Sequence, residues 1–132
     1  MLTVATANPL LEAAEELADL HRMREFTPWP KLPQLDAERA RLRHRIDLWV
    51  YISTPPPYPA ARTHTQTVGA VVEHMAEMAV EAFVALMHAP EPLYYDARVR
   101  LDEMSTAYQD LIDELTLGTR RVPSVTAALK PP

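Results

Sequence analysis

The sequence predicts an all-α protein, built as an antiparallel four-helix bundle with two long C-terminal helices and proline-rich connections. Three observations predict this class. The 132 residues include 13 prolines, and these cluster so that four long windows contain none. Apolar residues within those windows recur every three or four positions, which is the period of an amphipathic helix. The chain has only 2 glycines, too few for the left-handed turn positions of a large antiparallel sheet.

Composition indicates one domain, for which we expect bounds of 1–123 with a C-terminal tail at 124–132. The chain is 48% hydrophobic and 23% charged, and a domain of this size buries roughly two-thirds of its unfolded surface. The absence of cysteine excludes disulfides, thiolate metal sites and cysteine nucleophiles. No apolar run approaches the roughly 18 residues of a membrane span, and the N-terminus resembles no signal peptide. We therefore expect a cytoplasmic protein, or a virion-associated one if it is a phage structural protein.

The first two windows, 10–27 and 34–54, predict the shorter helices. Asn8 is a good N-cap and Pro9 suits the first helical position, so a helix of about 16 residues follows. In the second window one face is apolar, and four arginines lie on the opposite surface. We expect these arginines to pair with acidic helices, within the chain or across a dimer. Phosphate or nucleic-acid binding is the alternative, but aromatic residues and glycines do not interleave with them. The arginines are Arg39, Arg41, Arg43 and Arg45.

Windows 60–89 and 93–122 predict two helices of about 25 residues each, or about 38 Å. Thr63 and Gln66 have capping-box spacing at the start of the third helix. Two apolar lines follow, so we expect this helix to contact several neighbours. The short Pro90–Pro92 connection should fold the two helices into an antiparallel hairpin, and Gly118 is the expected C′ residue of the fourth. The two lines are Val68, Val71, Met75, Met78, Ala82 and Ala85, and Val72, Ala79, Phe83 and Leu86.

Carboxylates provide the alternative function, a metal-dependent all-α nucleotide hydrolase. Glu73, Glu77 and Glu81 recur every four residues and line one strip of the third helix. With acids of the fourth helix they could hold a divalent cation, which prefers several carboxylate oxygens. Their spacing differs from that of all-α nucleoside triphosphate pyrophosphohydrolases, and the histidines stand before the acids, the reverse of di-iron Glu-x-x-His. Two glycines exclude a phosphate loop. We therefore predict no catalytic residue, no metal ligand and no cofactor.

Two proline-rich segments carry the candidate partner-binding residues. Pro55-Pro56-Pro57-Tyr58 matches a Pro-Pro-x-Tyr ligand in polyproline II conformation. Trp29 stands between two prolines and is a second candidate anchor. The simpler interpretation is that each aromatic ring packs against the bundle. An exposed ring would be the best candidate for partner binding. The candidate residues are Trp29, Pro56, Pro57 and Tyr58.

Three stretches resemble an uncharacterised all-helical family of actinobacteria and their phages, known only as a domain of unknown function. They are Arg43-His44-Arg45-Ile46-Asp47-Leu48-Trp49, the His-Thr-Gln-Thr-Val-Gly run at 64–69, and 101–123 ending Gly-Thr-Arg-Arg-Val-Pro. The resemblance covers about 35–123, and Gln66 stands where the family pattern has an acid. It implies a helical fold and an actinobacterial or phage source, but no activity. In the second stretch, Thr67 can cap a helix and Gly69 permits a close helix crossing or a ligand approach.

These observations together predict a non-enzymatic helical interaction or assembly protein that self-associates. It would be a phage assembly component or an accessory host-directed protein. The expected partners are further copies of the chain or another protein, with no membrane and no nucleic acid. The apolar lines of the two long helices and the lack of a catalytic set motivate this prediction.

Overall fold

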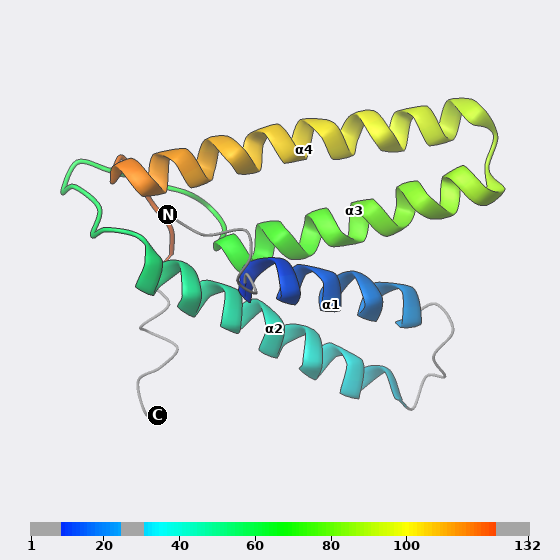
Figure 1. Ribbon diagram of the computed structural model, residues 1–132, viewed down its shortest axis with the longest axis horizontal. Helices are drawn as coiled ribbons and strands as arrows, with labels where there is room; N and C mark the ends of the chain where they lie inside the picture. The colour runs from blue at the N-terminus through cyan, green and yellow to red at the C-terminus, as the bar shows by residue number, and fades with distance from the viewer. Residues whose placement is uncertain (1–8, 25–30, 124–132) are drawn as a thin grey trace.

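The computed structural model describes residues 9–24 and 31–123, and it confirms the all-α class (Figure 1). Asn8, Trp29 and the tail at 124–132 lie outside the described residues. Within them, the only sheet is a parallel pair of two-residue strands. In chain order the elements are α1 (Pro9–Arg24), α2 (Leu32–Ser53), β1 (Arg62–Thr63), α3 (Val68–His88), α4 (Glu91–Leu117) and β2 (Arg120–Arg121).

The helix bounds follow the positions of the prolines, but α2 and α4 each begin two residues before the predicted window. The 16 residues of α1 match the expected length. Helix α2 begins at Leu32, two residues before the predicted window, because Pro33 lies in its first turn, where a missing N–H costs nothing. Pro92 likewise lies in the first turn of α4. At the other end, Gly118 ends this helix as predicted, with a left-handed φ of 77°.

The predicted start of the third helix was wrong by several residues. Helix α3 begins at Val68, and its N-cap is Thr67, whose side chain accepts a 3.2 Å hydrogen bond from the Ala70 N–H. Thr63 lies instead in β1, where it pairs with Arg121 of β2. The strand pairing keeps Thr63 extended, so its capping-box spacing with Gln66 is not used.

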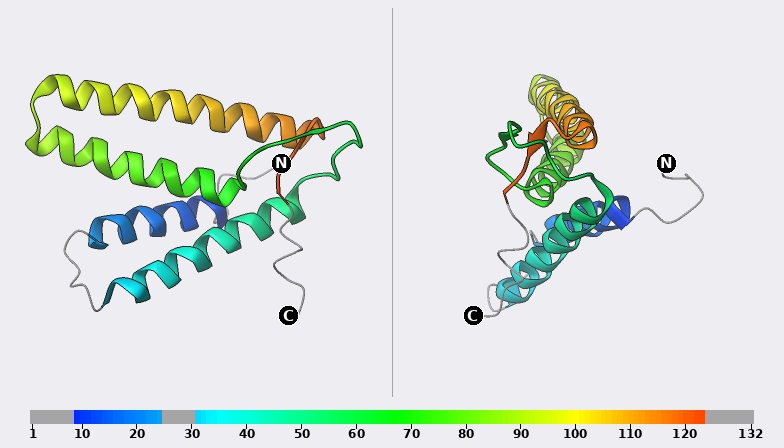
Figure 2. Two further views of the ribbon diagram at one scale, coloured as in Figure 1. Left: turned by 180° about the vertical axis from the view of Figure 1, so that it is seen from behind. Right: turned by 90° about the vertical axis from the view of Figure 1, so that its left-hand side faces the viewer.

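Helix α3 is the central helix of the fold. It packs against α1, α2 and α4, which confirms the expectation of several neighbours. Helix α4 runs back along α3 after a short connection through Ala89 and Pro90, and both views in Figure 2 keep the two side by side. Among the described helices α4 packs on α3, and its C-terminal end also contacts β2. One long side of α4 therefore has none of the described helices against it.

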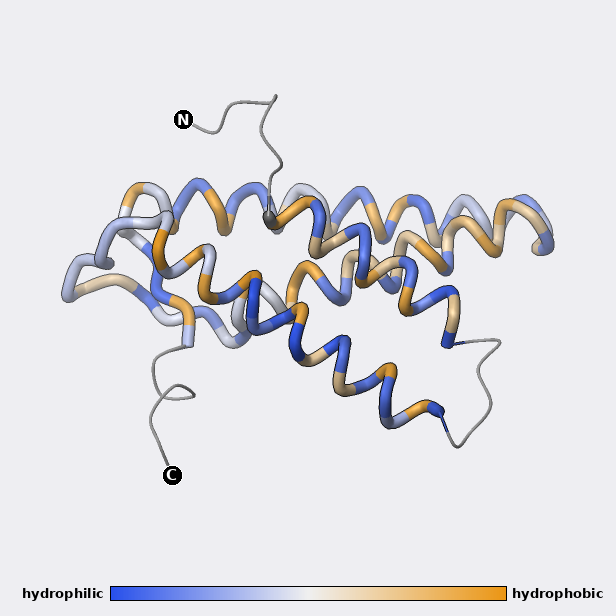
Figure 3. The backbone as a smooth tube through the Cα atoms, turned by 60° about the horizontal axis from the view of Figure 1, so that its bottom comes forward, coloured by the Kyte–Doolittle hydropathy of each residue, from blue (hydrophilic) through white to orange (hydrophobic). Residues whose placement is uncertain are grey.

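The core lies where α1 and α2 cover the N-terminal half of α3. Leu17, Leu42, Ile46 and Val68 are its fully buried large side chains. Buried positions of α3 run from Val68 to Ala82, after which the apolar lines continue but are uncovered. Figure 3 shows hydrophobic residues continuing to the far end of the α3–α4 hairpin. No helix in the described ranges is long and apolar enough to span a membrane.

The arginines of α2 pair with carboxylates, as the sequence predicted. Arg39 and Arg43 reach Glu73 of α3 at 3.3 and 3.8 Å. Arg45 lies 3.6 Å from Glu16 of α1, and Arg41 pairs with Glu38 one turn away on α2. Three of the four arginines thus form ion pairs that connect α2 to α1 and α3.

Gly69 sets the distance between α2 and α3. A Cβ atom on this residue would lie 2.4 Å from the Arg43 carbonyl oxygen and 2.9 Å from the Asp47 Oδ1 atom. Because backbone of α2 is the closest neighbour, a side chain cannot be accommodated by rotating another side chain away. Of the two roles that the sequence allowed at Gly69, a close helix crossing or a ligand approach, the structure shows the close crossing.

Gly69→Ala should destabilise the protein, although glycine to alanine in a helix normally stabilises it by about 1 kcal/mol. The added methyl overpacks the crossing, for which roughly 1–3 kcal/mol or more is typical. Urea denaturation followed by circular dichroism measures the change. Ala79→Gly, on the exposed surface of α3, is the control and should cost about 1 kcal/mol. A Gly69→Ala variant as stable as the wild type would contradict this account of the crossing.

Candidate functional site

Hydrogen bonds hold the proline-rich loop at 54–61 against the C-terminal end of α4. The Tyr58 N–H donates to the Gly118 carbonyl oxygen at 2.9 Å. The Tyr58 carbonyl oxygen accepts from the Ala61 N–H at 2.9 Å and from Arg121 Nη2 at 3.1 Å. Its ring lies over Gly118, where an added Cβ would come within 3.3 Å of it. Tyr58 thus packs on the end of α4, yet it remains 64% exposed.

Below this loop lies a cleft of about 690 Å³, here named the proline cleft. Its size is within the range of small-molecule sites. The predicted residues Pro56 and Pro57 line it, whereas Tyr58, the next residue, is not part of the lining. Trp29, the other predicted residue, lies outside the described residues. The lining residues are Asp47, Val50, Tyr51, Ile52, Thr54, Pro55, Pro56, Pro57, Thr63, Val68, Leu115, Arg120, Arg121, Val122 and Pro123.

Asp47 connects the proline cleft to the start of α3. Its Oδ1 atom accepts a 2.7 Å hydrogen bond from the Gly69 N–H, one of the amide groups left unpaired at a helix N-terminus. Burial raises the pKa of this carboxyl above its ordinary value. Hydrogen bonds from Gly69 and Thr67 and the positive charge of Arg43 oppose that rise without cancelling it. No local pattern in the sequence indicated this role, because the hydrogen-bond partner of Asp47 lies 22 residues away along the chain.

The parallel strand pair brings two arginines to the same cleft. Arg120 pairs with Arg62 and Arg121 with Thr63 in the strand register. The Arg120 Nε atom lies 2.8 Å from Glu114 Oε2, and Arg121 donates to the Tyr58 carbonyl. The contact of these arginines with the loop could not be predicted, because two paired strands of two residues each produce no periodic pattern in the sequence.

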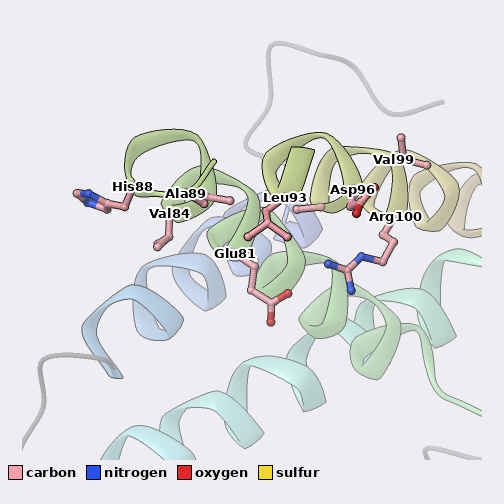
Figure 4. A pocket seen from close by; sticks show the side chains of 10 residues that line it. Glu81, Val84, His88, Ala89, Leu93, Asp96, Val99 and Arg100 are labelled. Carbon is pink, nitrogen blue, oxygen red and sulfur yellow. The ribbon is translucent and has the colours of Figure 1, made fainter. Parts of the chain in front are cut away.

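At the other end of the molecule, the free end of the α3–α4 hairpin exposes large apolar side chains. We name this surface the hairpin tip. Its members are between 39% and 65% exposed, far more than core residues. A groove of about 790 Å³ lies here. Val84 from α3 and Leu93 from α4 are among the residues that line it (Figure 4). The apolar members are Phe83, Val84, Leu86, Met87, Leu93, Tyr95 and Val99.

Charged residues of both signs border the groove at the hairpin tip. Glu81 comes from α3, and Asp96 and Arg100 come from α4 (Figure 4). Neither Glu81 nor Arg100 forms an ion pair within the described part of the chain. An acid and a base on the same rim, each without an ionic partner there, can pair across a symmetric contact with a second copy.

The predicted carboxylate strip divides between the core and the surface. Glu73 is only 8% exposed, and it lies between Arg39 and Arg43 of α2. Glu77 and Glu81 are exposed, so burial and arginine contacts separate Glu73 from them. Across 9–24 and 31–123, no group of three or more acids or histidines is arranged to hold a metal ion.

Comparisons of the chain with protein-family models, with curated proteins and with solved structures find no match. What the chain can do is therefore inferred from the chemistry of the proline cleft and the hairpin tip.

Asp47→Ala should cost about 1–2 kcal/mol of unfolding free energy, because the Gly69 N–H loses its acceptor at the helix N-terminus. Asp47→Asn keeps an oxygen acceptor and is the matched control, with a much smaller expected loss. Denaturant unfolding of the three proteins at neutral pH measures both values. Equal losses in the two variants would contradict the capping role.

The same variants test the raised pKa of Asp47. The Asp47 carboxyl stays protonated to a higher pH in the folded chain than in the unfolded chain, where its pKa is about 3.9. The contribution of Asp47 is therefore fully present below the unfolded pKa and is lost as pH rises through the folded pKa. The stability of wild type relative to Asp47→Asn should fall as pH rises across that interval. A relative stability that rises instead would show that the pKa is lowered.

Proposed function

We propose that this chain is a non-enzymatic helical interaction protein that self-associates through the hairpin tip. The observation that carries the proposal is the cluster of seven large apolar side chains at the free end of α3 and α4. Three of them, Val84, Leu93 and Val99, line one groove, and exposed apolar surface gathered in this way commonly marks a protein interface. The two long helices form a stiff arm that presents it.

The size of the hairpin tip suits a protein interface. Its seven side chains are each between 39% and 65% exposed. A standard interface buries about 800 Å² per partner. Burying a large apolar side chain contributes roughly 1.5–3 kcal/mol, so a few of them suffice for a specific complex. Phe83 and Tyr95 are the aromatic members, the residue class that most often dominates such contacts.

The charges on the rim favour a second copy as the partner. A two-fold interface joins the same patch on both copies, so it needs both signs of charge within that patch. The hairpin tip has Glu81 on α3 and Arg100 on α4, with Asp96 nearby. In a symmetric pair, Glu81 of one copy can meet Arg100 of the other. A patch of one sign would instead favour a different protein.

On this proposal, pairing of two hairpin tips gives the two long helices further helical neighbours, in addition to the bundle that the sequence predicts within one chain. Each copy supplies two antiparallel helices, α3 and α4, and among the described helices α4 packs on α3 alone. Four helices pack into a bundle when such hairpins cover each other's apolar faces. On this proposal, the bundle packing of the two long helices is completed between copies.

The wider role follows the resemblance over 35–123. We place the protein among small assembly components or host-directed accessory proteins of actinobacteria and their phages, acting in the cytoplasm or in the virion. Pro56, Pro57 and the exposed ring of Tyr58 stay a predicted contact for another protein. They lie at the opposite end of α4 from the hairpin tip (Figure 1), so both surfaces can be occupied at once.

Leu93→Glu should weaken self-association by about 100-fold or more, because each two-fold contact loses two buried leucines and gains two acids. Sedimentation velocity over a wide concentration range measures the dissociation constant. Leu117→Glu is the matched control, because Leu117 is 67% exposed near the other end of α4. It should leave the constant unchanged. A wild-type chain that stays monomeric at every concentration would overturn the proposal.

A charge reversal tests the pairing within the interface. Glu81→Arg should weaken the dimer, because it places two positive charges together across the two-fold axis. Adding Arg100→Glu should restore most of the loss, since the opposite signs meet again with the positions exchanged. Sedimentation measures both variants. If the double variant self-associates more weakly than either single variant, this charge arrangement is contradicted. The apolar contact is tested separately by Leu93→Glu.

A further inference from the structure

We propose that the proline cleft binds a small carboxylate with an apolar body, a site separate from the surface proposed for self-association. Both parts of such a ligand have a counterpart in the cleft. Apolar side chains from α2, α4 and the segment after β2 line it, and Arg120 and Arg121 are also among its lining residues.

The apolar part of the cleft has both a buried floor and an open margin. Val50 and Leu115 belong to the core and are almost fully buried. Tyr51 and Ile52, at the end of α2, line the same cleft and are 59% and 79% exposed. The prolines add rigid apolar wall without N–H donors. An apolar ligand here would cover the exposed side chains of Tyr51 and Ile52.

The charged part of the cleft can accept a carboxylate. Arg120 uses its Nε atom on Glu114, and Arg121 uses Nη2 on the Tyr58 carbonyl. A guanidinium has five N–H donors, so each group retains donors for a ligand. Forked pairing of arginine with a carboxylate is among the strongest hydrogen-bonding arrangements in proteins.

The acids near the cleft do not cancel this preference. Glu114 pairs with Arg120 at 2.8 Å, but Arg62 stands beside Arg120 in the strand register and adds a third positive charge. Asp47 is the acid that lines the cleft, and its Oδ1 atom is engaged by the Gly69 N–H. Burial also raises the pKa of Asp47, which weakens its repulsion of an anion as pH falls. The local charge therefore favours an anionic ligand over a cationic one.

Octanoate is the test ligand, with octanamide and octylamine as neutral and cationic matches of the same chain length. Methyl NMR titration follows the signals of Val50, Leu115 and Val122. Octanoate should shift these signals in a saturable way. Octanamide should bind about tenfold more weakly or worse, because hydrogen bonds to charged groups are worth roughly 10- to 100-fold in affinity. Octylamine should be the weakest of the three. Any of three results would overturn the proposal. Octanoate could shift only signals of the hairpin tip, it could shift none at millimolar concentration, or octanamide could bind equally well.

Paired substitutions at Ile52 separate charge from packing. Ile52→Asp and Ile52→Lys remove the same exposed apolar side chain, so neither should unfold the protein. The aspartate variant should bind octanoate about tenfold more weakly than the lysine variant, and equal affinities would overturn the proposal.

Arg121→Gln tests the guanidinium directly and should lower octanoate affinity about tenfold. Arg98→Gln, at an exposed position of α4 outside the cleft lining, is the control and should change nothing. Unchanged binding in Arg121→Gln would argue against the site. The Leu93→Glu variant should bind octanoate as the wild type does, so failure of self-association and failure of this site are distinguishable.

Discussion

The close crossing of α2 and α3 at Gly69 is the contact on which the other parts of the fold depend. A Cβ atom there would lie 2.4 Å from the Arg43 carbonyl oxygen. The two helices are therefore so close that only glycine, whose side chain is a hydrogen atom, fits at this position. Asp47 accepts the Gly69 N–H at the same point and ties the start of α3 to the middle of α2. The arginine pairs with Glu73 continue the contact one turn further along α3. This crossing fixes how much of α3 the first two helices can cover.

The unequal covering of α3 generates both candidate surfaces. Its N-terminal half is buried under α1 and α2, while its C-terminal end projects with α4 and leaves the hairpin tip exposed (Figure 1). Near the crossing, the chain must pass from Ser53 back to Val68, and the proline-rich loop that does so forms the wall of the proline cleft. The two surfaces lie near opposite ends of α4, whose 27 residues span about 40 Å at 1.5 Å per residue. Binding at one therefore does not obstruct the other.

Much of the fold could be predicted because helical rules are local. Proline at a first helical turn, glycine in a left-handed C-terminal position and apolar residues every three or four positions act over a few neighbours. The pairing of the α2 arginines with acidic helices also followed from charge alone. The start of α3 could not be predicted in the same way. Thr63 has a good capping spacing, but it pairs with Arg121, 58 positions later, and an extended pairing of two residues leaves no periodic pattern.

The sequence by itself therefore determined the helices and most of their ends, and it singled out Gly69 without deciding between a close helix crossing and a ligand approach. Tertiary structure alone decided which apolar residues are covered: Val68 and Phe83 belong to the same helix, and one is buried while the other is 56% exposed. Apolar periodicity is identical for a core face and an interface, because both exclude water once a neighbour is in place. Likewise Asp47, Arg120 and Arg121 gather at one cleft only through a crossing and a strand pair between distant segments. Local rules cannot report such contacts, because the partners are chosen by packing in space rather than by separation along the chain.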